Sequence, residues 1–321
     1  MLTYTLRRVL GMIPLLLLIS VVVFTLAKSM PGDALTGMID PANVKPEYIA
    51  EMRQQLGYND PIPQQFIRWF GNMLRGDFGQ SFIHKMPVSD LFFQRLQNTA
   101  ILATMAICIT YAIAFLTGMV AGRRPNTPID YSIQTVSYIV YALPSFIIGI
   151  VCIYIFAIKL GWVPASGSRS VGVADGTLAY YLNVLKNSLL PAFVLGSLGT
   201  AAYTQFLRND IIESSRKDYV RTARAKGTSE RHIYNRHILR NSLIPMVTFL
   251  GIDIGGLFGG AVITETLFVY PGMGELFVSS ISSRDYSVVM TITMFASVMT
   301  LIGNLISDLL YGYVDPRIRL R

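Results

Sequence analysis

The chain has 321 residues, of which 52% are hydrophobic and only 14% are charged, and its mean hydropathy is +0.47. This composition excludes an ordinary soluble domain, in which about a quarter of the residues are charged. The formal net charge of +8 arises in the segments that connect the apolar blocks and does not indicate a nucleic-acid-binding protein.

Six apolar blocks are each about 20 residues long, which is the length that a helix needs to cross a bilayer. They are Val9–Ala27, Ala100–Ala121, Ser132–Ile158, Leu189–Leu207, Pro245–Phe268 and Val288–Leu310. We therefore predict an all-α polytopic membrane protein with six transmembrane helices. The first block is longer than the apolar region of a secretory signal, so we expect it to remain as a span. Cys108 and Cys152 both lie inside apolar blocks and act as small hydrophobic residues.

Positive charge in the connections predicts the orientation, because basic residues favour the cytoplasmic side. If the N-terminus is inside, the inner segments hold most of the basic residues of the chain: Arg7, Arg8, Arg123, Arg124, those between 208 and 240, Arg317, Arg319 and Arg321. We expect both termini in the cytoplasm. The long segment 30–96, in which acidic and basic residues nearly balance, is then outside.

The chain divides into three parts: 1–29 with the first span, an extracytoplasmic segment 30–96, and a core 97–321 of five spans that includes a cytoplasmic loop 208–244. In the outer segment, EYIAEMRQQLG (47–57) is typical of a short amphipathic helix that ends at Gly57. FIRWFGNMLRGDFGQSF (66–82) is rich in aromatic residues and lies on the membrane surface or packs on the spans. A folded cap over the bundle and a role in substrate contact both fit this segment. The last outer loop has Pro271, Gly272 and Gly274 to form a tight turn.

Signatures of catalysis are missing from the sequence. It contains neither a phosphate-binding G-x-x-x-x-G-K-[ST] loop nor an H-E-x-x-H zinc motif. Its three histidines, His84, His232 and His237, all lie outside the apolar blocks. We therefore predict no catalytic residue and no metal ligand, which leaves a transporter, a channel or a passive assembly subunit.

The fifth apolar block carries an acidic residue, Asp253, about 12 Å deep by the helical rise. A carboxylate at such a depth costs about 2.5–3.5 kcal/mol, so it should face a bundle interior or a watered cavity. Helical spacing predicts one small and polar face made of Asp253, Gly256, Gly260 and Thr264, and a neighbouring row of Gly251, Gly255 and Gly259. A close helix–helix contact explains the glycines but not the aspartate. We therefore expect this face to border a transport pathway.

Two further intramembrane residues call for a prediction. Pro144 interrupts the third block in YALPSFIIG, where it removes a backbone donor and is expected to kink the helix. Such a kink shapes a cavity, or it is an ordinary proline tolerated in a span. Glu265, near the outer end of the fifth block, is expected to extend to the interface or to form an ion pair there.

Residues 218–245 read DYVRTARAKGTSERHIYNRHILRNSLIP, and Arg208 to Arg240 holds nine basic residues against four acidic ones. Ser215 and Asp218 have the spacing of a capping box, which predicts a short helix over 216–226. Gly227 has the C-terminal stop position, and Thr228 or Ser229 would begin a second helix toward the fifth span. A solvated face or contact with anionic headgroups is the alternative interpretation of the charges.

This segment resembles the EAA loop of ATP-binding-cassette (ABC) importer permeases, whose pattern is E-A-A, three residues, G, nine or ten residues, then I-x-L-P. Here Arg221-Thr222-Ala223 stand at E-A-A, Gly227 is the glycine, and Ile238-Leu239 fall near the distal apolar pair. Arg221 replaces the acidic residue and Arg240 stands where proline is usual. Both departures are typical of the first permease subunit of dipeptide/oligopeptide and nickel importers.

The resemblance to that subgroup extends along the whole chain. Its pieces are LRRVLGMIPLLLLISVVVFTLAKSMPGD, RWFGNMLRGDFGQSF, ALPSFIIG, DYVRTARAKG, ETLFVYPGMGELF and DLLYGYVDPRIRLR, in this order. It implies a type I ABC importer permease fold in a bacterial or archaeal plasma (inner) membrane. Implied partners are a second, related permease subunit, two cytoplasmic ATPases that bind ATP and magnesium, an extracytoplasmic binding protein and membrane lipid. This chain itself would bind no cofactor.

The resemblance also assigns roles. The coupling contact with an ATPase would involve Arg221, Thr222, Ala223, Arg224, Lys226, Gly227 and Ser229. The pathway residues remain Asp253, Gly256, Gly260, Thr264 and Pro144. Di- or oligopeptides are the favoured substrate, with nickel or another small solute as the alternative. A channel or a secondary transporter is the alternative from a different class.

Overall fold

The computed structural model describes residues 2–29, 51, 54, 57, 59–81, 83–170, 172–173 and 176–314. In these residues the regular structure is helical apart from one hairpin, in which β1 (Gln80–Ser81) pairs antiparallel with β2 (Met86–Pro87). Five helical segments are long and apolar enough to cross a membrane, and one bent pair provides a sixth span. They are Thr5–Ser29, Val88–Arg123, Pro128–Ala142 with Ser145–Lys159, Leu178–Ser215, Glu230–Gly256 and Tyr286–Gly312. The predicted all-α, six-span architecture is confirmed.

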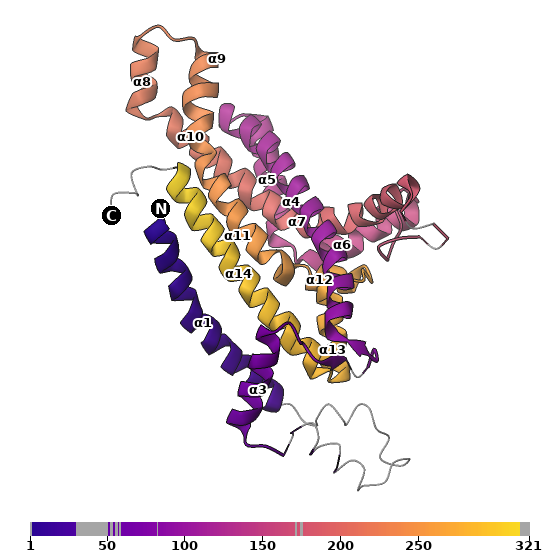
Figure 1. Ribbon diagram of the computed structural model, residues 1–321. Helices are drawn as coiled ribbons and strands as arrows, with labels where there is room; N and C mark the ends of the chain where they lie inside the picture. Colours follow the sequence, from indigo (N-terminus) through magenta and orange to yellow (C-terminus); the bar gives the residue numbers. More distant parts are fainter. Residues whose placement is uncertain are drawn as a thin grey trace.

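Two long helices, α4 (Val88–Arg123) and α7 (Leu178–Ser215), pack along one another at the centre of the bundle (Figure 1). Small residues bring them close. A Cβ added to Gly118 would lie 2.9 Å from Cβ of Leu207, and one added to Gly196 would lie 2.5 Å from the Thr110 hydroxyl. Backbones approach most closely in a membrane where side chains are small, so glycines specify this pair.

A second close pair is formed by α11 (Ile244–Gly260) and α14 (Tyr286–Val314), which also lie side by side in Figure 1. Gly251 abuts Ser307, and Gly255 abuts Gly303. The predicted row of small residues therefore makes the expected close contact at Gly251 and Gly255. The packing of Gly259 and Gly260 lies outside the described side chains.

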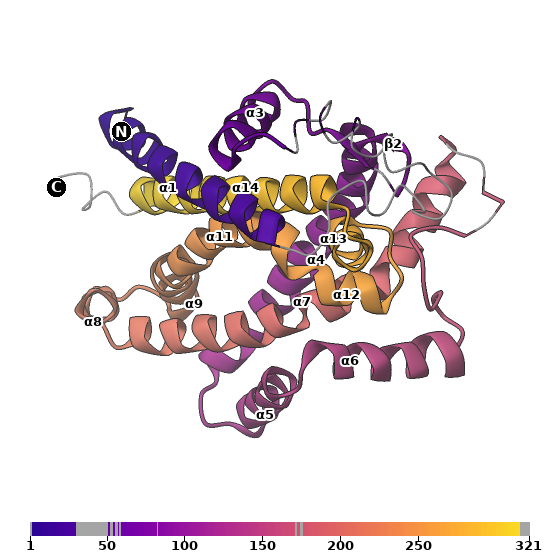
Figure 2. The same ribbon diagram turned by 90° about the horizontal axis from the view of Figure 1, so that it is seen from below.

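The third span is broken. Thr127 caps α5 (Pro128–Ala142), and Pro144 directly precedes α6 (Ser145–Cys152), which continues as the π-helical turn η1 (Ile153–Lys159). The two halves meet at 106°, a much larger change of direction than the expected kink. Leu143 is extended, as steric conflict with the following proline ring requires. Figure 2 shows α5 and α6 at the edge of the bundle, next to α7.

The fifth span begins earlier and ends earlier than its apolar block. The segments α9 (Glu230–His232), η2 (Ile233–Leu239), α10 (Arg240–Ser242) and α11 follow one another as one span, Glu230–Gly256. The second helix of the basic segment thus runs directly into the fifth span, as predicted. Helix α12 (Val262–Leu267) follows a break at Ala261.

The loop after α12 holds a helix, α13 (Met273–Ser283), behind the predicted turn at Pro271 and Gly272. Glu265 of α12 is fully buried and accepts hydrogen bonds from the Thr99 hydroxyl (2.6 Å) and from the backbone N–H groups of Gly274 (2.6 Å) and Glu275 (3.2 Å). The expectation that Glu265 extends to the interface or forms an ion pair is wrong. Its carboxylate instead satisfies the free N–H groups at the start of α13.

In the first outer segment, α3 (Ile62–Leu74) packs on the end of α1 (Leu2–Ser29). The ring centroids of Phe66 and Trp69 each lie 5.5 Å from that of Phe24. The aromatic segment therefore packs on a span, one of the two predicted placements. The predicted helix at 47–57 lies largely outside the described residues. Helix α4 begins at Val88, so its first turns belong to the segment 30–96 of the predicted division.

The contact between α11 and α14 yields a stability prediction. A Cβ on Gly303 would lie 2.3 Å from Cα of Gly255, so Gly303→Val should destabilise the folded protein by about 1–3 kcal/mol through overpacking. Thermal unfolding of the detergent-purified protein, followed by tryptophan fluorescence, measures this loss. Gly11→Val on α1 is the matched control, because nothing lies within 4 Å of an added Cβ there. Equal melting of the two variants would contradict the close contact.

Candidate functional site

A short helix, α8 (Asp218–Ala225), stands at one end of the bundle and turns back into α9 (Figure 1). Gly227 lies in the turn with φ +75°, the left-handed region that side chains resist. Its N–H bonds to the Arg224 carbonyl (2.9 Å), and the next N–H, of Thr228, bonds to the Ala223 carbonyl (3.1 Å). The predicted glycine stop is confirmed, and the two bonds close the end of α8.

The predicted capping box is wrong. Ser215 is the last residue of α7, and its hydroxyl donates to the Ile212 carbonyl at 2.7 Å instead of reaching toward Asp218. Bonding of a serine to an earlier carbonyl is common within helices, and α7 continues far enough to use it. Lys217 precedes α8 and Ser229 precedes α9, and neither side chain caps its helix.

One face of α8 is attached to the bundle. Val220 is fully buried and Ala223 nearly so, and both join a core cluster with residues of η2, α7 and α11. Their partners in the cluster include Ile233, Ile238, Leu207, Ile211 and Met246. Helix α8 is therefore held by apolar packing and is not a loose loop. Ala223, one of the predicted contact residues, belongs to this inner face.

The other face of α8 is exposed and basic. Arg221 has 75% of its side chain exposed, with a 3.5 Å ion pair to Asp218, which is even more exposed. Lys226, Gly227 and Ser229 are exposed as well, at the turn. Arg224 differs, because its guanidinium bonds both oxygens of Glu230 (2.7 and 3.1 Å) across the turn. This partner raises the pKa of Arg224 above its ordinary value and keeps the side chain within the turn.

An ion pair that the sequence did not reveal ties α5 to α7 near this end. The Arg208 guanidinium binds both oxygens of Asp130 (2.6 and 2.7 Å), and the backbone N–H of Asn126 donates to the same carboxylate. Asp130 is fully buried and Arg208 is 12% exposed. The two charged residues are 78 positions apart, and each lies near the end of a span, where charges are common. Nothing in the sequence therefore indicated that they form a pair.

This pair yields the second prediction. Arg208→Met should lower stability by about 3–5 kcal/mol, because it leaves the buried Asp130 carboxylate without a cation. Adding Asp130→Asn should recover a large part of the loss. Removal of the exposed Lys217–Glu213 pair by Lys217→Met is the control, and we expect it to cost about 0–1 kcal/mol. Chemical denaturation in detergent measures all three variants. An Arg208→Met protein as stable as the control variant would disprove a stabilising role of the pair.

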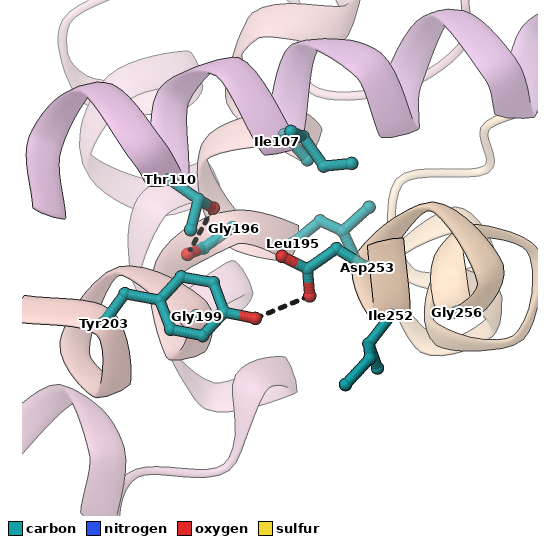
Figure 3. Close-up of a pocket in the computed structure, with 10 residues that line it drawn as sticks. Ile107, Thr110, Leu195, Gly196, Gly199, Tyr203, Ile252, Asp253 and Gly256 are labelled. Atoms are coloured by element: carbon teal, nitrogen blue, oxygen red, sulfur yellow. Dashed lines mark hydrogen bonds between the residues drawn. The ribbon is translucent and has the colours of Figure 1, made fainter. Parts of the chain in front are cut away.

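A second candidate site lies where α11 faces the α4–α7 pair (Figure 3). The Asp253 carboxylate accepts hydrogen bonds from the hydroxyls of Tyr111 (2.8 Å) and Tyr203 (2.6 Å). It opens onto a cleft of about 280 Å³, which Thr110, Tyr203 and Gly256 also line. Below, this space is called the Asp253 cleft. Its walls are otherwise mainly apolar, with Ile107, Leu195 and Ile252 among them.

The cleft brings together only part of the predicted polar face. Asp253 and Gly256 line it, whereas Thr264 lies on α12 beyond the break and is buried. Pro144 lies at the bend between α5 and α6 and is not among the lining residues. Sequence reasoning missed Tyr111 and Tyr203, because tyrosines in apolar blocks resemble ordinary core residues. Among the described residues, no three His, Cys, Asp or Glu side chains gather to hold a metal ion.

Comparison with known proteins covers the whole chain. The family of binding-protein-dependent transport system inner membrane components matches residues 114–320, and the family of the N-terminal part of such components matches residues 1–103. The chain is 39% identical over 319 residues to the oligopeptide transport system permease protein AppB of Bacillus subtilis, with 99% of both chains covered.

Two further curated relatives also match from end to end. The di/tripeptide transport system permease protein DppB of Pseudomonas aeruginosa is 33% identical over 333 residues, with 99% of both chains covered. The glutathione transport system permease protein GsiC of Escherichia coli is 33% identical over 321 residues, with 100% of both chains covered.

Proposed function

The chain belongs to the family of binding-protein-dependent transport system inner membrane components, and from this we propose that it is one permease subunit of an ATP-driven peptide importer. The observation that carries the proposal is the end-to-end similarity to permease proteins of transport systems. A channel or a secondary transporter would not need the rigid, exposed turn that α8 forms at the end of the bundle.

Peptides are the proposed substrates. The three relatives described above are named for oligopeptides, for di- and tripeptides and for glutathione, which are all peptides. The mainly apolar walls and the single carboxylate of the Asp253 cleft suit an organic substrate better than nickel, because nickel prefers imidazole and other nitrogen or sulfur ligands. Import of a peptide into proteoliposomes that hold the complete complex tests the proposal.

The proposed complex contains a second permease subunit, two ATPases that bind ATP and magnesium, and a binding protein on the outer side. Large apolar side chains on α5 and α6 support the second permease subunit or lipid as a neighbour. Among them Tyr138, Tyr141, Phe146 and Ile150 are exposed in the isolated chain. Surfaces of this kind require a hydrophobic partner.

We place the coupling contact with an ATPase on the outer face of α8 and its turn. Arg221, Thr222, Lys226, Gly227 and Ser229 form the exposed contact in this proposal. Ala223 fixes α8 to the core, and Arg224 braces the turn through Glu230. The helix can then transmit force, because apolar packing joins it to η2 and hence to the fifth span.

The translocation pathway in this proposal follows the face of α11 that carries Asp253, Gly256 and Gly260, whereas Thr264, predicted for the same face, is buried on α12 beyond the break. An intramembrane carboxylate is costly and is often found along a substrate pathway, and Asp253 opens onto a cleft, whereas Glu265 is sealed by the protein. The bend at Pro144 would shape the space beside α7 by turning α6 away from the direction of α5.

The orientation in this proposal puts both termini and α8 in the cytoplasm of a bacterial or archaeal cell. Helix α1 begins, and α14 ends, toward the end of the bundle that carries α8, and α3 and α13 lie at the opposite end (Figure 1). Basic residues are concentrated at the α8 end, as the positive-inside rule requires for a cytoplasmic side.

The coupling proposal predicts the effect of two substitutions. Gly227→Val forces a branched side chain into positive φ, at a cost of about 1–2 kcal/mol, and should reshape the turn. Arg221→Glu reverses the more exposed of the two positive charges of α8. We expect each variant to reach the membrane, to retain less ATPase during purification and to import peptide at least tenfold more slowly.

Matched controls separate this coupling effect from general damage. Gly161→Val changes another glycine with positive φ and free space around it, in the connection after η1. Arg124→Glu reverses an exposed charge at the turn between α4 and α5. Both controls should retain the ATPase. Normal retention and import by Gly227→Val and Arg221→Glu would remove the basis for the coupling role.

The proposed orientation predicts cysteine reactivity. In a chain whose own Cys108 and Cys152 are replaced by alanine, Ser282→Cys on α13 should react with a membrane-impermeant maleimide added to intact cells. Arg124→Cys, at the opposite end of the bundle, should react only after the membrane is permeabilised. The reverse pattern would invert the proposed topology.

A further inference from the structure

Within the part of the chain that the structure describes, Asp253 has no positive partner, in contrast to two other aspartates of the bundle. Asp130 is paired with Arg208, and Asp308 with Arg8. Of the ion pairs between described residues, none includes Asp253, whose hydrogen-bond partners are the hydroxyls of Tyr111 and Tyr203. Hydroxyl donors stabilise a carboxylate but leave its net charge in place, so an uncompensated negative charge faces the cleft.

Glu265 shows that a carboxylate in this bundle can be held without facing a cleft. Glu265 is fully buried and takes three hydrogen bonds, two of them from backbone N–H groups at a helix start. Glu265 does not line the Asp253 cleft. Asp253 is half-buried and its carboxylate opens onto a space of about 280 Å³ (Figure 3). One carboxylate is sealed by the protein, and the other is accessible to a ligand.

The two tyrosines that bind the open carboxylate belong to a group of packed aromatic rings. The ring centroids of Tyr111 and Tyr203 are 5.3 Å apart, and Phe249 stacks on Tyr203 at 5.4 Å with nearly parallel planes. The faces of such rings carry negative potential and attract cations. The Tyr203 ring lines the same cleft as the Asp253 carboxylate, so an organic cation in this region of low dielectric constant would be attracted by both.

The size of the cleft limits what can enter it. A volume of about 280 Å³ lies below the roughly 300–1,000 Å³ of pockets that enclose a whole small ligand, so only one end of a larger molecule fits. Gly256 leaves open space, since nothing lies within 4 Å of a Cβ added there. The apolar side chains of Ile107 and Leu195 suit the carbon atoms next to a charged group.

We propose that the Asp253 cleft binds a primary ammonium group of the substrate, with the Asp253 carboxylate as counter-ion and the Tyr203 ring beside it. This inference rests on the proposed import of peptides. A peptide carries such a group at its amino terminus and on each lysine side chain. The tyrosine hydroxyls compete with the ammonium for the carboxylate, so binding stays weak enough for the substrate to move on.

The test compares three peptides of similar size by isothermal titration calorimetry on the purified complex, without the binding protein. Trialanine amide has an amino-terminal ammonium, acetyl-Ala-Lys-Ala amide has only a lysine ammonium, and acetyl-trialanine amide has neither. We expect at least tenfold tighter binding of one or both cationic peptides than of the neutral one. The cationic peptide that gains more identifies the source of the ammonium group.

Three substitutions test whether the preference for cationic peptides arises in the Asp253 cleft. Asp253→Asn keeps the size of the side chain and should reduce the preference to less than twofold. Tyr111→Phe keeps the ring, removes one competing donor and should leave the preference equal or larger. Asp308→Asn, which removes a carboxylate at the far end of α14, is the control and should leave the preference unchanged.

Several outcomes would overturn the inference. Equal or undetectable binding of all three peptides by the wild-type complex is one. Persistence of the preference in Asp253→Asn is another, and so is its loss in Tyr111→Phe at unchanged thermal stability. Uptake of trialanine into proteoliposomes, with the binding protein present, is measured in parallel. Uptake without an ammonium preference refutes only the ammonium site, whereas absence of any peptide uptake refutes the proposed function.

Discussion

The cost of holding carboxylates between membrane helices determines which helices of this bundle are neighbours. Three acidic groups inside the bundle take their partners from other elements: Asp130 of α5 from α7, Glu265 of α12 from α4 and α13, and Asp253 of α11 from α4 and α7. An unpaired polar group in hydrocarbon costs several kcal/mol, so a helix that moved away from its partner would lose that stabilisation. Glycine contacts then set how closely the helices approach.

Local signals in the sequence predicted much of the architecture, and partners distant along the chain explain what was missed. Hydropathy located the six spans, and Gly227 marked its turn, because both depend on neighbouring residues only. The hydrogen bond between Thr99 and Glu265 joins residues 166 positions apart, and that between Tyr111 and Asp253 joins residues 142 apart. The sequence predicted that Asp253 needs polar surroundings. The spacing of residues along the fifth span could not identify the hydroxyl groups on other helices that supply them. Likewise Pro144 predicted a kink but not a bend of 106°.

In the proposed coupling, force applied to α8 would have a continuous route to the Asp253 cleft. Val220 and Ala223 pack on η2, and η2 belongs to the same span, Glu230–Gly256, that carries Asp253. Because the segments of this span follow one another without a connecting loop, a displacement at the α8 end would have a direct path along the backbone to the cleft. Arg224 and Glu230 keep the two arms of the turn together, which favours transmission over bending at Gly227.

Glycine packing divides the bundle into two close pairs, α4 with α7 and α11 with α14. Between α11 and the first pair the contact is thin, and the hydrogen bonds of Asp253 to Tyr111 and Tyr203 cross it. At the outer end of this boundary, the hydrogen bond from the Thr99 hydroxyl to Glu265 forms a separate connection. A cation that draws the Asp253 carboxylate away from the tyrosines would therefore loosen the boundary in the middle of the membrane and leave its outer end fixed. The Asp253 carboxylate would then take part both in substrate binding and in movement of the α11–α14 pair. Coupling between two conformational states requires such a group, because its contacts with the ligand differ between the states.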